Sequence, residues 1–338
     1  MLRLPRFTAW LLPAAFAALG AASATAQDAL PRNNERPFFW RVDGEVPSYL
    51  FGTFHLPDER ILALNPEVER ALAAADAVFL ELDFGEVKVP PLLAQMRMPA
   101  GRSWSDIMPA GLLERVERHM GATTSRAMQQ FRPFVAAVPL LLKKHKLNGD
   151  PLDDVIYKDA KSAGKQVGGL ETVAEQVAAF TALELADEVK ILQCTLDQLE
   201  EYEARGLDLT EEMIKAYCAG DTKRVVDFFT AMNGTGAAWA QANRALLTDR
   251  NIRMAERIDQ KLQAERSKRF VFAVGAGHLI GDTNIVDLLR ARGYTVTRIP
   301  MTAANIDEEI EQLQREVEQR QARIRALQEA RPKAKKAG

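Results

Sequence analysis

Residues 269–278 have the sequence RFVFAVGAGH, and the fold prediction starts from this stretch. Phe270 to Val274 is a short apolar run, rich in aromatic and β-branched residues, which is typical of a buried strand. The run leads into Gly275, and His278 follows three positions later. Residues 49–55, YLFGTFH, repeat the arrangement with Gly52 and His55. Functional residues gather at the carboxyl ends of strands in open α/β sheets, so we expect both histidines at one rim of one sheet.

Most of the remaining predicted strands also lie near the two ends of the chain. Residues 38–42 and 48–54 flank Asp43-Gly44 and predict a hairpin. Further strands are predicted at 77–82, within 164–171 and at 294–299. Helical periodicity dominates residues 105–262, with core-facing spacing at 139–147, 177–202 and 245–262. The pattern predicts an α/β (α+β) fold whose central mixed sheet is built from N- and C-terminal strands, with a large helical block inserted between them.

Two helix boundaries are marked by the residues that usually occupy them. Asn65 precedes Pro66 at the start of the helix predicted at 62–75, where an asparagine cap and a proline at the first helical position are favoured. Gly293 follows a helix predicted around 283–292, as a glycine C-cap does.

Composition excludes several classes of protein. The chain has 338 residues, a formal net charge of −2 and 47% hydrophobic residues, which fits a globular protein without a nucleic-acid footprint or a membrane-surface patch. Arg3 and Arg6, an apolar run at 9–19 and Ala24-Thr25-Ala26 match a secretory signal, so we expect cleavage after Ala26 and a periplasmic or secreted, soluble mature protein.

We therefore divide the chain into a signal peptide (1–26), a polar leader (27–36), one domain (37–302) and a charged amphipathic helix with a basic tail (303–338). Apolar residues of the last segment recur at spacings of three and four between Ile306 and Leu327, which predicts either one long helix on the domain or a coiled-coil homodimer. Cys194 and Cys218 either pair in the oxidising compartment or stay as buried thiols.

The chemistry is expected around His55 and His278. Glu81 and Asp83 end the strand at 77–82, so their carboxylates should reach the same rim. Neutral imidazole and carboxylate are the usual ligands of a divalent metal that keeps open positions for water. Glu81 and Asp83 have an equally plain alternative as a helix cap or a surface ion pair.

Other polar residues are weaker candidates for the same rim. Glu171 follows the glycine turn at 168–169, and Arg250-Asn251 lies on a polar helix, where the arginine can supply a cation for a substrate carboxylate or an oxyanion. A solvated or paired arginine is the alternative. Gly52 is expected to let another backbone approach closely. His119 and His145 have no partner in the sequence pattern and are interpreted as surface residues.

The sequence does not match the common motifs of nucleotide-binding proteins and other hydrolases. Gly275, Gly277 and Gly281 imitate a dinucleotide-binding loop, but the third glycine is one place late and no acid ends the next strand. The chain has no phosphate-binding loop of the G-x-x-x-x-G-K-[ST] type, no G-x-S-x-G turn and no H-E-x-x-H helix.

Five short segments together resemble the TraB/GumN (TraB/PrgY, TIKI-like) family: 49–55, Phe79–Asp83, Gly169–Thr172, Arg250-Asn251 and Val274–Leu279. The resemblance spans roughly residues 37–300 in the expected order. It implies a relationship to the TIKI metalloproteases, which use manganese or cobalt, and more distantly an erythromycin esterase/ChaN-like fold. It further implies an active site of His55, His278 and Glu81, with Glu171, Arg250 and Asn251 at other recurring positions.

The leading hypothesis is an exported metal-dependent hydrolase, most simply a peptidase. His55, His278 and Glu81 would hold a divalent metal, Mn²⁺ or Co²⁺ by the resemblance. Glu81, Asp83 and Arg250 are the catalytic candidates, and Glu171 and Asn251 the substrate-binding ones. A non-enzymatic protein that sequesters a small ligand, a peptide or a haem-like group is the alternative, and a scaffold acting through the C-terminal helix is the third. A peptide or small molecule is the expected partner, with no nucleic acid and no membrane after signal cleavage.

Overall fold

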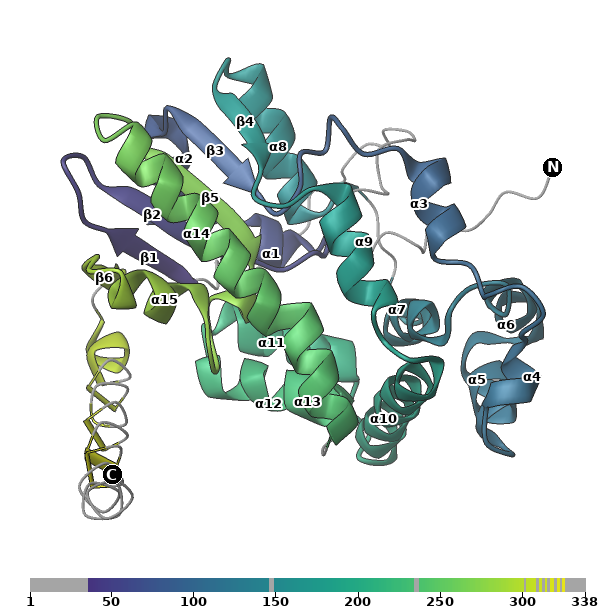
Figure 1. Cartoon of the computed structure of the whole chain (residues 1–338). Helices are drawn as coiled ribbons and strands as arrows, with labels where there is room; N and C mark the ends of the chain where they lie inside the picture. Colours follow the sequence, from purple (N-terminus) through teal and green to yellow (C-terminus); the bar gives the residue numbers. More distant parts are fainter. Residues whose placement is uncertain are drawn as a thin grey trace, which may run out of the picture.

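Strands from both ends of the chain meet in one six-stranded sheet (Figure 1). The computed structural model describes residues 36–145, 149–233 and 237–300, with tail residues 302–307, 310–311, 314, 317–318, 321–322 and 324–325. The strands lie in the order β4-β3-β5-β2-β1-β6. Their bounds are β1 (Phe39–Val42), β2 (Ser48–Thr53), β3 (Ala77–Leu80), β4 (Gln166–Gly169), β5 (Phe270–Gly275) and β6 (Val296–Arg298).

The sheet is mixed, as predicted. β5 lies between β3 and β2 and is parallel to both, whereas β1 pairs antiparallel with β2 and β6. All six residues of β5 are buried, which explains why this strand has a continuous apolar sequence rather than an alternating one. The predicted hairpin is confirmed by the register of β1 and β2, in which Phe39 lies opposite Phe51.

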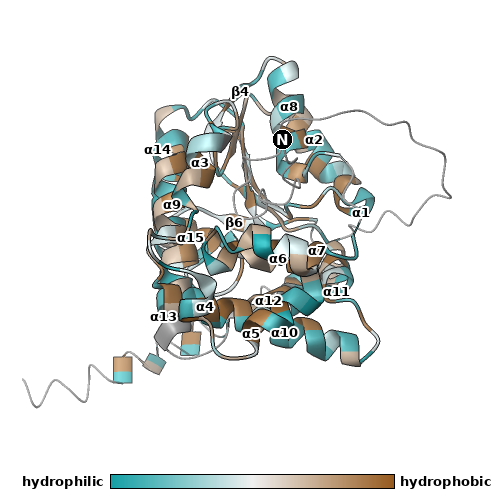
Figure 2. Cartoon of the chain, turned by 90° about the vertical axis from the view of Figure 1, so that its right-hand side faces the viewer, coloured by the Kyte–Doolittle hydropathy of each residue, from teal (hydrophilic) through white to brown (hydrophobic). Residues whose placement is uncertain are grey.

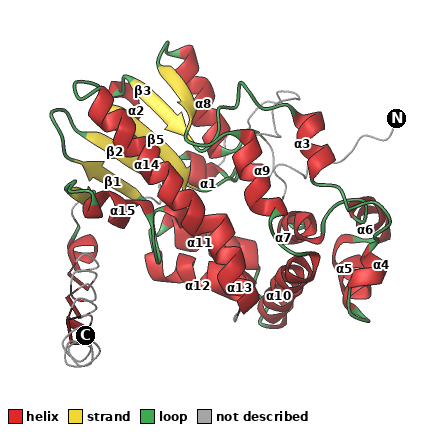
Figure 3. Cartoon of the chain, viewed as in Figure 1, coloured by secondary structure: helices red, strands yellow, loops and turns green. Residues whose placement is uncertain are grey.

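The inserted helical block is also confirmed, and Figure 3 shows α10, α12 and α13 gathered away from the strands. Figure 2 shows hydrophobic and hydrophilic residues on the same helices, for example α5 and α10, as expected where one face meets the core. The helix bounds are α1 (Glu59–Leu62), α2 (Pro66–Ala74), α3 (Val89–Gln95), α4 (Trp104–Ile107), α5 (Leu112–Met120), α6 (Ala122–Met128), α7 (Ala137–Leu142), α8 (Leu152–Ser162), α9 (Val173–Thr181), α10 (Leu185–Ala204), α11 (Leu209–Cys218), α12 (Thr222–Asn233), α13 (Ala237–Asn243), α14 (Asp249–Ala264) and α15 (Ile285–Ala291).

The marked helix boundaries are found where they were expected. Asn65 accepts a hydrogen bond from the Glu67 amide, and Pro66 is the first residue of α2. Gly293 has a φ of 95°, a conformation that favours glycine, two residues after the end of α15.

The stretch 177–202 is not one helix. α9 ends at Thr181, and Glu184 has an extended backbone before α10 begins. Leu183, in the turn between them, is buried against Ile191 and Ala242, so the break serves packing.

Gly52 lies where two segments cross. A Cβ at this position would stand 2.7 Å from the Cβ of Phe38 and 3.0 Å from the Cα of Ala276. The expectation of a close backbone approach is therefore confirmed, since Ala276 belongs to the other Gly-x-x-His turn. Tyr217 of α11 donates a hydrogen bond to the Gly52 carbonyl at 2.9 Å and so ties the helical block to this strand end.

Cys194 and Cys218 are unpaired in the structure. None of the helices in the described part of the chain is long and apolar enough to span a membrane. The predicted signal peptide and nearly all of the leader lie outside the described residues.

Candidate active site

Strand register brings the ends of three strands together. In the parallel pairs Thr53 lies beside Gly275, and Leu80 lies beside Ala273. The turns after β2, β3 and β5 therefore start at nearly the same level of the sheet. His55 comes two residues after the end of β2, Glu81 directly after β3, and His278 three residues after β5. This is the convergence at one rim that the repeated turns suggested.

Glu81 is the centre of the cluster. Its Oε1 accepts a hydrogen bond from the Gly275 amide at 2.8 Å and lies 3.5 Å from Nε2 of His278 and 3.9 Å from Nε2 of His55. Its Oε2 accepts from Arg250 at 2.6 Å and from Gln176 at 3.0 Å. Burial opposes ionisation of this carboxyl, but Arg250, the two imidazoles and the Gly275 amide outweigh it and hold the pKa of Glu81 well below its usual range.

His55 is held by a buried carboxylate. Its Nδ1 lies 2.6 Å from Oδ2 of Asp153, and the Thr53 hydroxyl donates to Oδ1 of the same aspartate at 2.6 Å. Because a carboxylate only accepts, Nδ1 of His55 carries the proton and Nε2 is directed at Glu81. Burial lowers the pKa of His55, but the charge and hydrogen bond of Asp153, with Glu81, raise it to about 9.

His278 is held by an amide instead. Nδ2 of Asn251 donates to the Thr283 carbonyl at 3.0 Å, which fixes the amide so that its Oδ1 accepts from Nδ1 of His278 at 2.6 Å. The Nε2 of His278 thus carries a lone pair and faces Glu81. Burial and the nearby Arg250 guanidinium lower the pKa of His278 to about 3, so this imidazole is neutral. Histidines that ligate metals are oriented in this way by a partner at the other ring nitrogen.

Arg250 lies between two buried carboxylates. It donates to Oε2 of Glu81 at 2.6 Å and through Nε to Oε2 of Glu171 at 2.8 Å. Arg253 adds a second contact to Glu171 at 3.1 Å. The side chain of Glu171 has no exposed surface, and that of Arg250 is 5% exposed. Arg250 therefore holds Glu81 in place and is itself held by Glu171, and both residues present little surface to a ligand.

Asp83 is directed elsewhere. Its Oδ1 accepts from the Tyr157 hydroxyl and the Gly85 amide, both at 2.8 Å, so it forms a turn after β3. Neither of these two partners belongs to the Glu81 cluster. Asp83 thus stabilises a turn, which differs from the helix cap or surface ion pair considered as its alternative.

Two residues of the cluster were not anticipated from the sequence. Asp153 lies in the first turn of α8, where acidic residues are common because they complement the helix dipole. Gln176 lies in α9, among residues that form its buried face. Neither position stands out in the sequence. The Asp153 side chain is only 3% exposed, which is unusual for an aspartate, but this burial cannot be recognised from the sequence.

The spacing of the donor atoms in the cluster is close to that of a metal site, although the coordination is incomplete. Both Nε2 atoms lie within 3.9 Å of one oxygen, well inside the roughly 10 Å that would exclude a shared single-ion site. Donors with bonds of about 2.1 Å in a tetrahedral arrangement are separated by about 3.4 Å. A Cβ at Gly275 would stand 3.1 Å from Nε2 of His55 and 3.2 Å from Oε1 of Glu81, so glycine keeps this space open.

Among the residues that the structure describes, no group of three or more His, Cys, Asp or Glu side chains is placed so that it could hold a metal ion as it stands. The two histidines and Glu81 offer three converging donor atoms. They do not form a closed coordination sphere.

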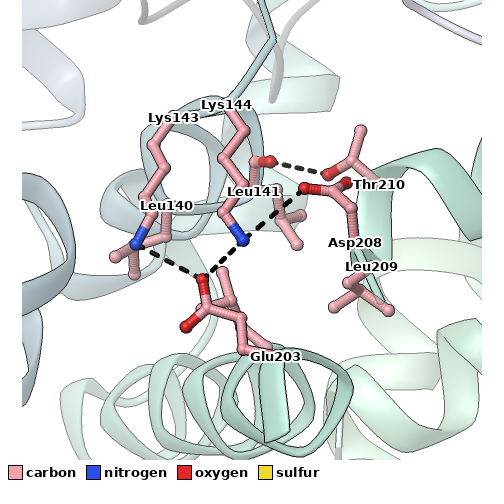
Figure 4. Close-up of a pocket in the computed structure, with 9 residues that line it drawn as sticks. Leu140, Leu141, Lys143, Lys144, Glu203, Asp208, Leu209 and Thr210 are labelled. Carbon is pink, nitrogen blue, oxygen red and sulfur yellow. Dashed lines mark hydrogen bonds and ion pairs between the residues drawn. The ribbon is translucent and has the colours of Figure 1, made fainter. Parts of the chain in front are cut away.

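His119 and His145 are not isolated surface residues, and that interpretation was wrong. His119 is 6% exposed at its side chain and lies 3.0 Å from Glu200, while His145 lies 2.9 Å from Asp208. Both lie within hydrogen-bonding distance of a carboxylate in the helical block. A cavity of about 10 Å³, room for roughly one water molecule, lies beside them between Lys143, Lys144, Glu203 and Asp208 (Figure 4). It contains none of the residues around Glu81.

Comparison with known proteins agrees with the resemblance seen in the sequence. The profile of the TraB/PrgY/gumN family matches residues 38–298, which include all six strands and the whole site. The chain belongs to the TraB/PrgY/gumN family. It is similar to metalloprotease TIKI1 of Danio rerio, with 27% identity over 80% of this chain and 64% of that protein.

Two further relatives give the same picture. Metalloprotease TIKI2 of Xenopus tropicalis is 29% identical over 82% of this chain and 62% of its own length. Metalloprotease TIKI1 of Homo sapiens is 27% identical over 87% and 68%. The chain thus spans somewhat less than two thirds of the first two relatives. No solved structure matches it.

Proposed function

We propose that this protein is a metal-dependent hydrolase that cleaves peptide bonds at the cluster of His55, Glu81 and His278. One observation carries the proposal: two imidazoles, each oriented through Nδ1, direct Nε2 at the same carboxylate oxygen. The relatives named as metalloproteases support the reaction class.

The residues would divide the work as follows. Nε2 of His55, Nε2 of His278 and Oε1 of Glu81 would hold a divalent cation. His55, which its pKa of about 9 keeps protonated at neutral pH, would release its Nε2 proton when the cation binds. When bound, such an ion lowers the pKa of water toward neutrality and polarises a scissile carbonyl. Imidazole nitrogens with one carboxylate suit first-row transition ions, and the family resemblance puts Mn²⁺ and Co²⁺ first among those to test.

The supporting residues keep these donors in place. Asp153 and Asn251 fix the tautomers and ring planes of His55 and His278. Arg250 keeps Glu81 ionised, because its charge offsets that of the buried carboxylate. The His55 side chain is 26% exposed, against 6% for His278 and 4% for Glu81, so a substrate reaches the cluster on the His55 side.

We also propose that the enzyme works outside the cytoplasm. The positively charged start, the apolar run and the Ala24-Thr25-Ala26 sequence support export to the periplasm or beyond.

Hydrolysis with a matched pair of variants tests the proposal. The purified protein is stripped with a chelator, and cleavage of a quenched-fluorescent peptide library is measured after Mn²⁺, Co²⁺ or Zn²⁺ is added back. We expect turnover that requires metal, loss of turnover in Glu81→Gln, and retention in Asp83→Asn, which makes the same carboxylate-to-amide change two residues away. Turnover that survives the chelator, or equal activity in both variants, would contradict the proposal.

A further inference from the structure

A row of exposed apolar residues lies on the helix that follows the family domain. Ile306, Ile310, Val317 and Ile324 are 40%, 47%, 52% and 54% exposed. In the described part of the chain, Ile252 is the one other large hydrophobic residue with comparable exposure. Four of five such residues thus lie on one segment, and a concentrated apolar stripe marks an interaction surface.

Within the part of the chain that the structure describes, the stripe is not covered. Asn305 is buried, but every described residue from Ile306 to Arg325 is exposed. In Figure 1 the described residues of this segment, drawn in yellow, lie away from the sheet. The expectation of a helix lying on its own domain therefore does not hold for the described tail residues.

The spacing of the stripe is that of a coiled coil. Ile310, Val317 and Ile324 recur every seven residues, and Ile306 precedes the first by four. In heptad terms the three are a positions and Ile306 is a d position, which the sequence continues with Leu313 and Leu327. Such a seam is buried by packing against a second helix of the same kind.

The distribution of charge selects the partner and its direction. Residues 306–318 contain six acidic and one basic side chain, whereas residues 319–331 contain four basic and one acidic. A parallel pair would place like halves side by side and would put Arg320, at a d position, opposite its own copy. An antiparallel pair places each acidic half beside a basic half, which charge complementarity favours.

We propose that the helix beginning at residue 303 forms an antiparallel two-stranded coiled coil with a second copy of this chain. The two family domains then lie at opposite ends of the coil. The proposal rests on the exposure, spacing and charge of the tail residues, so it does not depend on the hydrolytic function.

Oligomeric state with matched variants tests the seam. The full mature chain should sediment as a dimer over a dilution series, and Val317→Glu should sediment as a monomer. Ala322→Glu, which adds the same charge at an outward f position, should remain a dimer. A circular dichroism melt of each variant checks that the domain stays folded. A wild-type monomer, or a Val317→Glu dimer, would overturn the proposal.

Cross-linking tests the direction. Ile310→Cys and Ile324→Cys are made separately in a Cys194→Ala, Cys218→Ala background, given different tags and treated with a short bismaleimide. An antiparallel pair should cross-link only when the two variants are mixed, because at ~1.5 Å rise per residue each position lies far from its own copy. Cross-linking of each variant to itself would indicate a parallel pair and overturn the antiparallel assignment.

Discussion

Arg250→Met removes the cation between two buried carboxylates while keeping most of the aliphatic stem. The side chains concerned are 5% exposed for Arg250, 4% for Glu81 and 0% for Glu171. Removing one partner of a buried ion pair leaves an uncompensated charge and typically costs about 3–5 kcal/mol. We expect a loss of that size in the free energy of unfolding, measured by urea denaturation with circular dichroism at pH 7.

Arg253→Met is the matched control. Arg253 contacts the same Glu171, at 3.1 Å, but its side chain is 35% exposed, so its loss should cost about 1 kcal/mol or less. In the Arg250→Met background, Glu171→Gln should restore part of the loss, because it neutralises one of the stranded charges. If Arg250→Met costs no more than Arg253→Met, Arg250 does not brace Glu81, and its role as a cation for substrate returns.

Gly275→Ala should abolish metal-dependent hydrolysis with little loss of stability, because its Cβ would enter the space between His55 and Glu81. Gly52→Ala should instead lower the free energy of unfolding by about 1–3 kcal/mol through overpacking against Phe38. Enzyme kinetics and denaturation of both variants check this, and an active Gly275→Ala enzyme would refute it. Burial, only partly offset by Arg132, raises the pKa of Glu188 from 4.5 to about 7. The folded chain therefore keeps a proton there that the unfolded chain releases, so stability should fall as pH rises from 4.5 to 7, and Glu188→Gln should flatten that slope in denaturation curves; an unchanged slope would count against it. N-terminal mass analysis of a periplasmic extract should find Gln27 first, and an intact Met1 in the membrane fraction would reject export.

The sequence predicted the site where chemistry and topology coincide. A strand that ends in Gly-x-x-His is recognisable on its own, and finding it twice predicted that β2 and β5 share a rim. Glu81 could be included because it directly follows a continuous apolar strand. Parallel pairing then places the ends of β2, β3 and β5 at one level of the sheet, whatever the distance between these strands in the sequence.

Roles that depend on three-dimensional partners were not predictable. Arg250 looks like any polar helix residue until Glu81 and Glu171 are seen on either side of it. Asp153 is hidden among the acidic residues of a helix start, and His119 and His145 acquire partners only when α10 and the start of α11 pack beside them. Such pairs join segments far apart in sequence, and no local pattern records them.

Metal binding by the purified protein tests the central claim most directly. Equilibrium dialysis against Mn²⁺ or Co²⁺, followed by elemental analysis, should find about one ion per wild-type chain and per His145→Ala chain, because His145 pairs with Asp208 outside the cluster. His55→Ala and His278→Ala should lose the ion while staying folded, and Asp153→Ala and Asn251→Ala should weaken binding by roughly 10–100-fold, since they orient the ligands. Equal metal content in the wild type and in the His55 and His278 variants would contradict a metal centre at this site.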